Sequence, residues 1–173
     1  DYEKLVEARA EPRPLISGEL NPIFQGTYSS RIELKQWMRE LESLLISAEK
    51  AGALLLALGD HLDNKTVWKA WEPVLFNQAH DLMSGVMTDQ VWEDTKLSFA
   101  YSRRLITEEL NFRLRCLTDR INTLGDGVPV VVFNNLDWVR TDVVYTTIGF
   151  TAAEVNGVEL FGPHGEHVPV QLL

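Results

Sequence analysis

The chain has 173 residues, of which 45% are hydrophobic and 24% are charged. This is the composition of a globular protein with enough length for one or two modest cores, and it excludes a disordered or fibrous chain. The 16 basic and 25 acidic residues give a net charge of −9, which would repel phosphate backbones and anionic lipids. The longest apolar stretch, residues 51–58, is far shorter than the roughly 20 residues of a membrane span. We therefore expect no nucleic-acid partner and no membrane partner.

Cys116 is the only cysteine, so the chain can form neither an intrachain disulfide nor a cysteine zinc cluster. A lone thiol favours a reducing compartment, and we expect a cytoplasmic protein. The chain begins with Asp1 instead of methionine and stops at Leu173 within a predicted strand. These two ends predict a fragment of a longer protein.

Residues 1–30 are predicted to form a linker that leads into the first packed element. Prolines and glycines interrupt this stretch, which favours an extended chain. The prolines are Pro12, Pro14 and Pro22. Tyr28 and Arg31 stand at the start of the following helix, where we expect them to fix the linker against the helices.

The first of three predicted amphipathic helices begins near Arg31, with Ser29 or Ser30 as its N-cap. Its apolar side chains recur at three- and four-residue spacing, as in a helix that buries one face. These positions are Leu34, Trp37, Met38, Leu41, Leu44, Leu45 and Ala48. A polar break at residues 59–64 ends this helix.

A second helix is predicted from Val67 to Leu82, with Ser84-Gly85 as its stop. Thr88-Asp89 then caps a third helix that continues to Gly125-Asp126-Gly127. Its apolar positions are Trp92, Phe99, Ile106, Leu110, Leu117, Ile121 and Leu124. Short connections place successive helices side by side, so residues 31–126 are predicted to form an antiparallel three-helix bundle.

The sequence after Gly127 is rich in residues that favour strands. We predict strands at residues 128–133 and 143–148, and two shorter ones near 158–161 and 168–172. Residues 127–173 are therefore expected to begin a β domain.

Adjacent His80 and Asp81 lie near the predicted end of the second helix, and such a pair can offer a metal ligand and a hydrogen-bond acceptor together. On an ideal helix His80 lies about 180° from Trp71, so it should point away from the core. Phe76 and Met83 would share its face. The alternative is a solvent-facing histidine that suits the helix C-terminus, beside a solvated aspartate.

No complete metal or catalytic site is predicted within the chain. Zinc sites use three or four protein ligands, whereas His61, His164 and His167 lie in predicted loops that form no convincing set with His80. No pair of carboxylates is marked out by its setting, and Glu108-Glu109 is expected on a solvated helix face.

Three stretches together resemble bacterial family 38 glycoside hydrolases, which are α-mannosidases. They are residues 18–31, the segment Asn77-Gln78-Ala79-His80-Asp81, and residues 132–138. In that family the first leads from a catalytic barrel into a three-helix middle domain, the second lies on the second helix of that domain, and the third begins a C-terminal β-sandwich. The resemblance therefore implies an α+β fold, in which an antiparallel three-helix bundle is followed by the first strands of a β-sandwich over residues 127–173.

The same resemblance implies that His80 is the zinc ligand of the middle domain and that Asp81 binds sugar hydroxyls. The other zinc ligands and the nucleophile belong to the N-terminal barrel of the family, so one Zn²⁺ would be shared with that barrel. No catalytic residue is then expected in this chain, which alone would be inactive. The full-length protein would be a bacterial, cytoplasmic, retaining enzyme that hydrolyses α-mannosides.

A second hypothesis is a non-catalytic helical scaffold or protein-interaction module. In this interpretation Phe76, His80 and Met83 form one exposed face that binds a protein partner, without metal or sugar.

Overall fold

The computed structural model describes residues 2–9, 14–21, 23–151 and 155–172. The chain divides into two units, Asp1–Ile121 and Asn122–Leu173. Pro12 and Pro22, two of the prolines behind the linker prediction, lie outside the described residues. The predicted linker contains two short helices, α1 (Tyr2–Glu7) and α2 (Gln25–Ser29).

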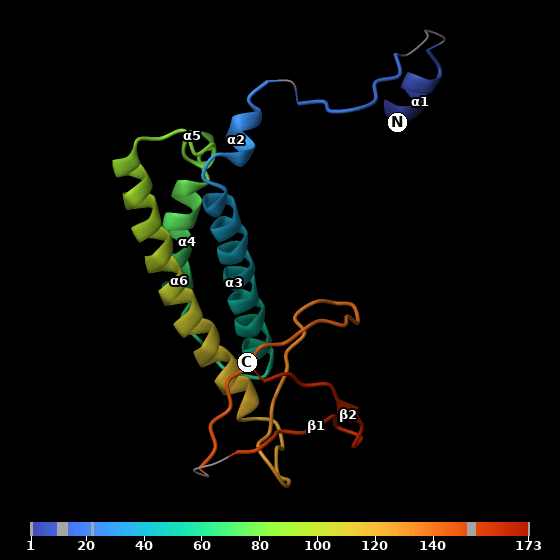
Figure 1. Cartoon of the computed structure of the whole chain (residues 1–173), viewed down its shortest axis with the longest axis vertical. Coiled ribbons are helices and arrows are strands. Elements are labelled where there is room, and N and C mark those ends of the chain that lie inside the picture. The colour runs from blue at the N-terminus through green and yellow to red at the C-terminus, as the bar shows by residue number, and fades with distance from the viewer. Residues whose placement is uncertain (1, 10–13, 22, 152–154, 173) are drawn as a thin grey trace. The chain divides into compact units, whose positions relative to one another are not determined.

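Three long helices make up the bundle of the first unit (Figure 1). They are α3 (Ile32–Ala57), α4 (Lys65–Asn77) and α6 (Asp89–Thr118), with the one-turn helix α5 (His80–Met83) between the last two. No helix among the described residues is long and apolar enough to cross a membrane.

The ion pairs at the two ends of the bundle show that α3 and α6 run in the same direction. Arg31, just before α3, pairs with Asp89 at the start of α6 at 2.8 Å, and Arg120, just after α6, pairs with Asp60, just after α3, at 2.6 Å. Helix α4 runs antiparallel to both, as expected for an up-down-up bundle with short connections.

The bundle core contains most of the apolar positions that the sequence spacing predicts, whereas Trp68 and Leu75 of the second predicted stripe are 59% and 47% exposed. Each stripe repeats at three or four residues, so one face of each helix is removed from water and contributes the main favourable free energy of folding. The buried members are Leu34, Met38, Leu41, Leu45 and Ala48 of α3, Val67, Ala70 and Val74 of α4, and Phe99 and Ile106 of α6.

The predicted N-cap of the first helix is wrong. Neither Ser29 nor Ser30 caps α3; Arg31 occupies the N-cap position in a left-handed conformation with φ 47° and ψ 61°. Thr88 does cap α6 as predicted, because its side chain accepts a hydrogen bond from the Val91 amide at 3.4 Å.

Helix α6 ends at Thr118, seven residues before the predicted glycine stop at Gly125. Leu117 is the last buried residue of α6, and α3 ends at Ala57 on the facing side. Ile121 and Leu124, assigned to the buried face from their spacing, are 44% and 94% exposed. Helical spacing alone therefore predicted too long a helix.

The second unit contains one small sheet among its described residues. Strand β1 (Leu160–Phe161) pairs antiparallel with β2 (His167–Val168), with Leu160 opposite Val168. The predicted strands at 128–133 and 143–148 are not formed, because an extended segment is a strand only when a neighbour completes its hydrogen-bond ladder. The β-sandwich stays a prediction.

The bundle contains one fully buried cation, the guanidinium of Arg113 on α6. Its Nε donates to Glu109 Oε1 at 2.7 Å, Nη1 donates to the Ala48 carbonyl at 2.9 Å, and Nη2 donates to Asn64 Oδ1 at 2.9 Å. Glu109 was expected on a solvated face, but its side chain is only 14% exposed. The pair links α6 to α3 and to the α3–α4 connection, because a buried charge must be paired and hydrogen-bonded.

Gly52 provides the space that this guanidinium occupies. A Cβ built on Gly52 would overlap Arg113 Nη1 and lie 3.0 Å from Arg113 Cζ. A glycine within a helix normally costs about 1 kcal/mol relative to alanine. Its presence in α3 is therefore explained by the close approach of the guanidinium.

We predict that Gly52→Ala destabilises the chain by about 1–3 kcal/mol, the usual cost of overpacking a filled interior. Urea denaturation followed by circular dichroism measures this. The matched control is Gly26→Ala, where the added Cβ would meet only Ser30 Oγ at 3.9 Å. Equal or greater stability of Gly52→Ala would show that the guanidinium does not need this space.

Candidate functional site

The segment that contains His80 and Asp81 begins where α4 stops. Asn77 is buried, with 3% exposure, and its Nδ2 donates to the Pro73 carbonyl at 2.7 Å and to Ser98 Oγ of α6 at 3.0 Å. Gln78 Nε2 donates to Glu42 Oε1 of α3 at 2.7 Å. The buried Asn77 contacts fix the end of α4 against α6, and the exposed Gln78 contact adds a hydrogen bond to α3.

The helix predicted to reach Leu82 is interrupted at Gln78 and Ala79, and His80 starts the separate helix α5. The extended backbone of Ala79, with ψ 135°, breaks the helical phase. The angle between Trp71 and His80 expected from a continuous helix therefore does not apply. His80 and Asp81 lie on a one-turn helix at the same end of the bundle as α2 (Figure 1).

The side chains of His80 and Asp81 project into solvent, with 95% and 90% exposure. His80 Nε2 lies 3.3 Å from Asp81 Oδ1, so an imidazole nitrogen and a carboxylate oxygen stand next to each other. Such a pair offers two of the donor types that Zn²⁺ uses.

The described residues contain no group of three or more histidine, cysteine, aspartate or glutamate side chains that could hold a metal. His61, His164 and His167 are exposed, and the ring of His167 contacts Phe161 in the second unit. The donors at His80 and Asp81 thus fit zinc in chemistry, but they are too few to form a site alone.

The single exposed face predicted from Phe76, His80 and Met83 is not formed. Phe76 is 73% exposed on α4, whereas Met83 packs against the bundle core. The break between α4 and α5 separates these side chains. The observation behind the interaction-module hypothesis is therefore lost.

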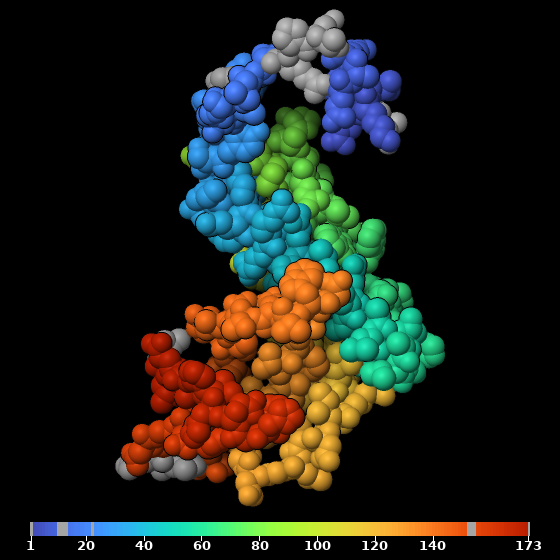
Figure 2. All heavy atoms as spheres, turned by 90° about the vertical axis from the view of Figure 1, so that its right-hand side faces the viewer, coloured from blue at the N-terminus to red at the C-terminus, as the bar shows by residue number. Residues whose placement is uncertain are grey.

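Arg31 ties the connection after α5 to the start of α3, as predicted for its role at the helix start. Its Nη1 donates to the carbonyls of Gly85 at 2.9 Å and Met87 at 2.7 Å. The residues near 80–87 accordingly lie against those near 25–35 in the space-filling view (Figure 2).

Lys35 is a second basic residue at this end, and sequence reasoning missed it. Its Nζ donates to the Ser30 carbonyl at 2.5 Å and to the Ser84 carbonyl at 3.3 Å. Desolvation by partial burial lowers the pKa of Lys35. A single lysine on a helix beside an apolar stripe carries no sequence signal for such a contact.

Two tryptophans pack against each other at the same end of the bundle. The rings of Trp37 and Trp92 stack with centroids 5.5 Å apart and an interplanar angle of 4°. The Arg31 guanidinium lies 5.5 Å from the Trp92 centroid, and the Arg103 guanidinium lies 5.9 Å from that of Trp37. Stacking and cation–π contacts of this kind stabilise the packing of α3 on α6.

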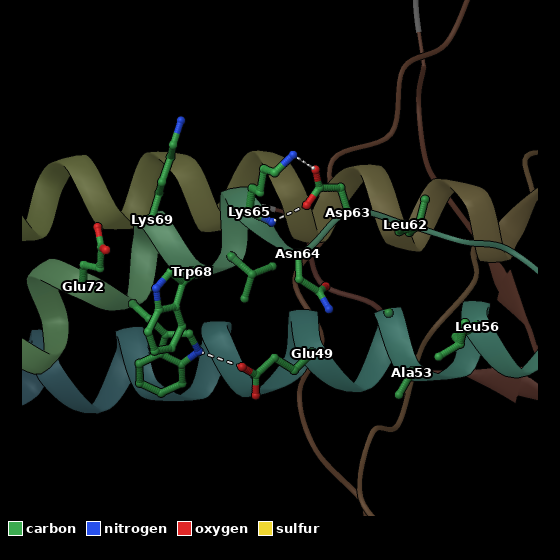
Figure 3. A pocket seen from close by; sticks show the side chains of 13 residues that line it. Glu49, Ala53, Leu56, Leu62, Asp63, Asn64, Lys65, Trp68, Lys69 and Glu72 are labelled. Atoms are coloured by element: carbon green, nitrogen blue, oxygen red, sulfur yellow. Dashed lines mark hydrogen bonds and ion pairs between the residues drawn. The ribbon is translucent and has the colours of Figure 1, made fainter.

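A groove lies between α3 and α4, close to their connection (Figure 3). Trp68 and Trp71 of α4 line it, and Trp71 Nε1 donates to Glu49 Oε1 at 2.8 Å. At its edge the side-chain hydrogen bond from Lys65 lowers the pKa of Asp63. The lining contains no residue of the 76–87 segment, so the groove is separate from His80 and Asp81.

These observations define the first unit as a helical bundle domain that presents an exposed histidine–aspartate pair at one end. The sequence model of the alpha mannosidase middle domain matches residues 22–117, more than half of the chain, and the chain therefore belongs to this family. The matched range contains α2 to α6 almost completely, including His80 and Asp81. No curated protein and no solved structure matches the chain.

We predict that Asn77→Ala destabilises the bundle by about 1–3 kcal/mol, because it removes the two hydrogen bonds that this buried side chain makes. The matched control is Gln78→Ala, an exposed neighbour whose replacement should change stability by less than about 0.5 kcal/mol. Urea unfolding of both variants tests this. Similar values for the two would mean that Asn77 does not fix the end of α4.

Proposed function

We propose that this chain acts as the middle domain of a zinc-dependent retaining α-mannosidase of glycoside hydrolase family 38. The observation that carries the proposal is the family match over residues 22–117, which includes the exposed His80–Asp81 pair. In this proposal His80 is a zinc ligand and Asp81 binds hydroxyl groups of an α-mannoside.

The exposure of the pair supports a site shared with another domain. His80 and Asp81 face solvent, and the described residues bring too few donors to them to hold zinc. A catalytic barrel of the same polypeptide would supply the remaining ligands, the nucleophile and the acid–base carboxyl. The chain alone would then be inactive.

When bound, zinc would polarise the sugar hydroxyls that it contacts and help to orient the ring. His80 would contribute an imidazole nitrogen, and the neighbouring Asp81 carboxylate would accept hydrogen bonds from the sugar. The distance of 3.3 Å between His80 Nε2 and Asp81 Oδ1 keeps the two polar groups next to each other. This division of roles between metal and hydrogen-bond acceptor can be tested separately for each residue.

We predict that His80→Ala lowers kcat/KM for an aryl α-mannoside by about 100-fold or more in the protein that includes the catalytic domain. Even groups that only hydrogen-bond a metal ligand typically cost about 10- to 100-fold when they are removed. The zinc content of the purified protein should fall in parallel, and a chelator should inactivate the wild type.

The matched control is His61→Ala, which removes an exposed histidine from the α3–α4 connection of the same unit. It should leave activity and zinc content unchanged. Full activity and full zinc content in His80→Ala would contradict the assignment and leave the chain a scaffold.

We predict that Asp81→Asn lowers kcat/KM by about 10- to 100-fold with zinc content unchanged, because a charged hydrogen bond contributes about 1.5–3 kcal/mol. Steady-state kinetics and metal analysis of the same samples measure this. Asp94→Asn, on the exposed side of α6, is the control. Loss of zinc in Asp81→Asn would instead assign this carboxylate to the metal.

A further inference from the structure

We propose that Arg31 and Lys35 are positioning residues that hold the His80–Asp81 pair in place at the end of the bundle. Neither residue touches the pair directly. Both hold the backbone of the residues that immediately follow it. This inference rests on the proposed function above, because it assigns the purpose of the anchoring to that site.

Arg31 anchors the loop through both terminal nitrogens of its guanidinium. Nη1 bridges the carbonyls of Gly85 and Met87, and Nη2 pairs with Asp89 at 2.8 Å. A planar guanidinium offers several donors in a fixed geometry, which suits it to hold a loop through more than one acceptor.

The backbone of Arg31 is itself in an unfavourable conformation. Its φ of 47° lies in the left-handed region, which residues other than glycine seldom adopt. Such conformations persist only where surrounding contacts determine them, and they concentrate at functional sites. Here the contacts are those that the side chain makes with residues 85–89 and with the Trp92 ring.

Gly85 allows the loop to approach the start of α3 closely. It has φ 76°, and a Cβ at this position would lie 2.6 Å from the Ser30 carbonyl oxygen. Lys35 Nζ donates to that same oxygen and to the Ser84 carbonyl. One ammonium group therefore connects the two backbone segments that Gly85 brings together.

Hydrogen bonds at the end of α5 connect the anchored residues to the His80–Asp81 pair. The Ser84 amide donates to the His80 carbonyl at 2.9 Å, and Ser84 Oγ donates to the Asp81 carbonyl at 3.1 Å. Lys35 binds the Ser84 carbonyl and is thus connected through Ser84 to the backbone of His80 and Asp81. Arg31 binds the carbonyl of the next residue, Gly85, whose amide donates to the Leu82 carbonyl at 3.0 Å, so it holds the backbone that directly follows the pair. On the other side of the pair, Gln78 is bound to Glu42.

The opposite end of the bundle provides a matched control. Arg120 Nη1 donates to the Leu58 carbonyl at 3.4 Å, and its Nη2 pairs with Asp60 at 2.6 Å. Arg120 thus resembles Arg31 in holding a loop carbonyl and an aspartate, but the loop that it holds is the α3–α4 connection. Arg120→Gln should remove comparable contacts without affecting α5.

The first experiment measures amide hydrogen exchange of the chain itself, in which neither zinc nor catalysis takes part. We expect Arg31→Gln and Lys35→Met to accelerate exchange at residues 82–87 by about tenfold or more, while the central turns of α3 and α6 exchange at the wild-type rate. Arg120→Gln should leave residues 82–87 unchanged.

The second experiment measures zinc affinity and kinetics in the protein that includes the catalytic domain. Arg31→Gln should weaken zinc binding by about 10- to 100-fold, as for groups that orient metal ligands. Arg31→Lys should restore part of the affinity, because it keeps the charge but not the bridging geometry. Arg120→Gln should bind zinc like the wild type, although its thermal stability falls.

The outcomes separate this inference from the proposed function. Wild-type exchange at residues 82–87 in Arg31→Gln and Lys35→Met would overturn the positioning role, even if His80→Ala abolishes activity. Equal loss of zinc affinity in Arg31→Gln and Arg120→Gln would also overturn it, since the effect would then be general destabilisation. If His80→Ala leaves activity and zinc binding intact, the proposed function fails and the positioning role fails with it.

Discussion

The buried guanidinium of Arg113 is the constraint on which the helix arrangement depends. A fully buried cation is tolerated only when its charge and donors are matched, and Glu109, the Ala48 carbonyl and Asn64 supply that match from three parts of the chain. These partners fix the axial position of α6 relative to α3 and hold the α3–α4 connection. Gly52 leaves the space for this approach. Apolar stripes alone allow sliding between helices, whereas this set of hydrogen bonds does not.

At each end of the bundle, an arginine outside the long helices holds a connecting segment. Arg120 holds the connection after α3, and Arg31 holds the connection before α6. Both cations act on backbone carbonyls, which are the groups left without partners where helices end. The apolar core supplies most of the free energy of folding, and these cations determine where each connection lies. The apolar centre thus stabilises the bundle, and the arginines at its ends fix the positions of the connecting segments.

The sequence predicted what depends on local pattern. The apolar stripe of α3, the Thr88 cap and the break at residues 59–64 are confirmed, whereas Ile121 and Leu124 at the end of the third predicted stripe are exposed. The break before His80 was not predicted, because no glycine or proline marks Gln78 and Ala79, and the Asn77–Ser98 hydrogen bond beside it joins residues far apart in the sequence. Glu109 and Arg113 resemble an ordinary surface pair at i,i+4, and only the glycine on the facing helix makes their burial possible. His80 and Asp81 were selected by residue type and resemblance, and their roles stay predictions.

In a metal site shared between two domains, each domain must orient its own ligand. In a site built within one domain, neighbouring ligands help to orient one another, but a lone histidine on a bundle can be oriented only by its own backbone and the contacts that hold it. Helix α5 is a single turn and could not keep its place without tertiary contacts. The fixed end of α4 on one side and the cations of Arg31 and Lys35 on the other supply those contacts. Under the proposed function, the bundle would thus serve as a rigid support that presents one ligand to a partner domain.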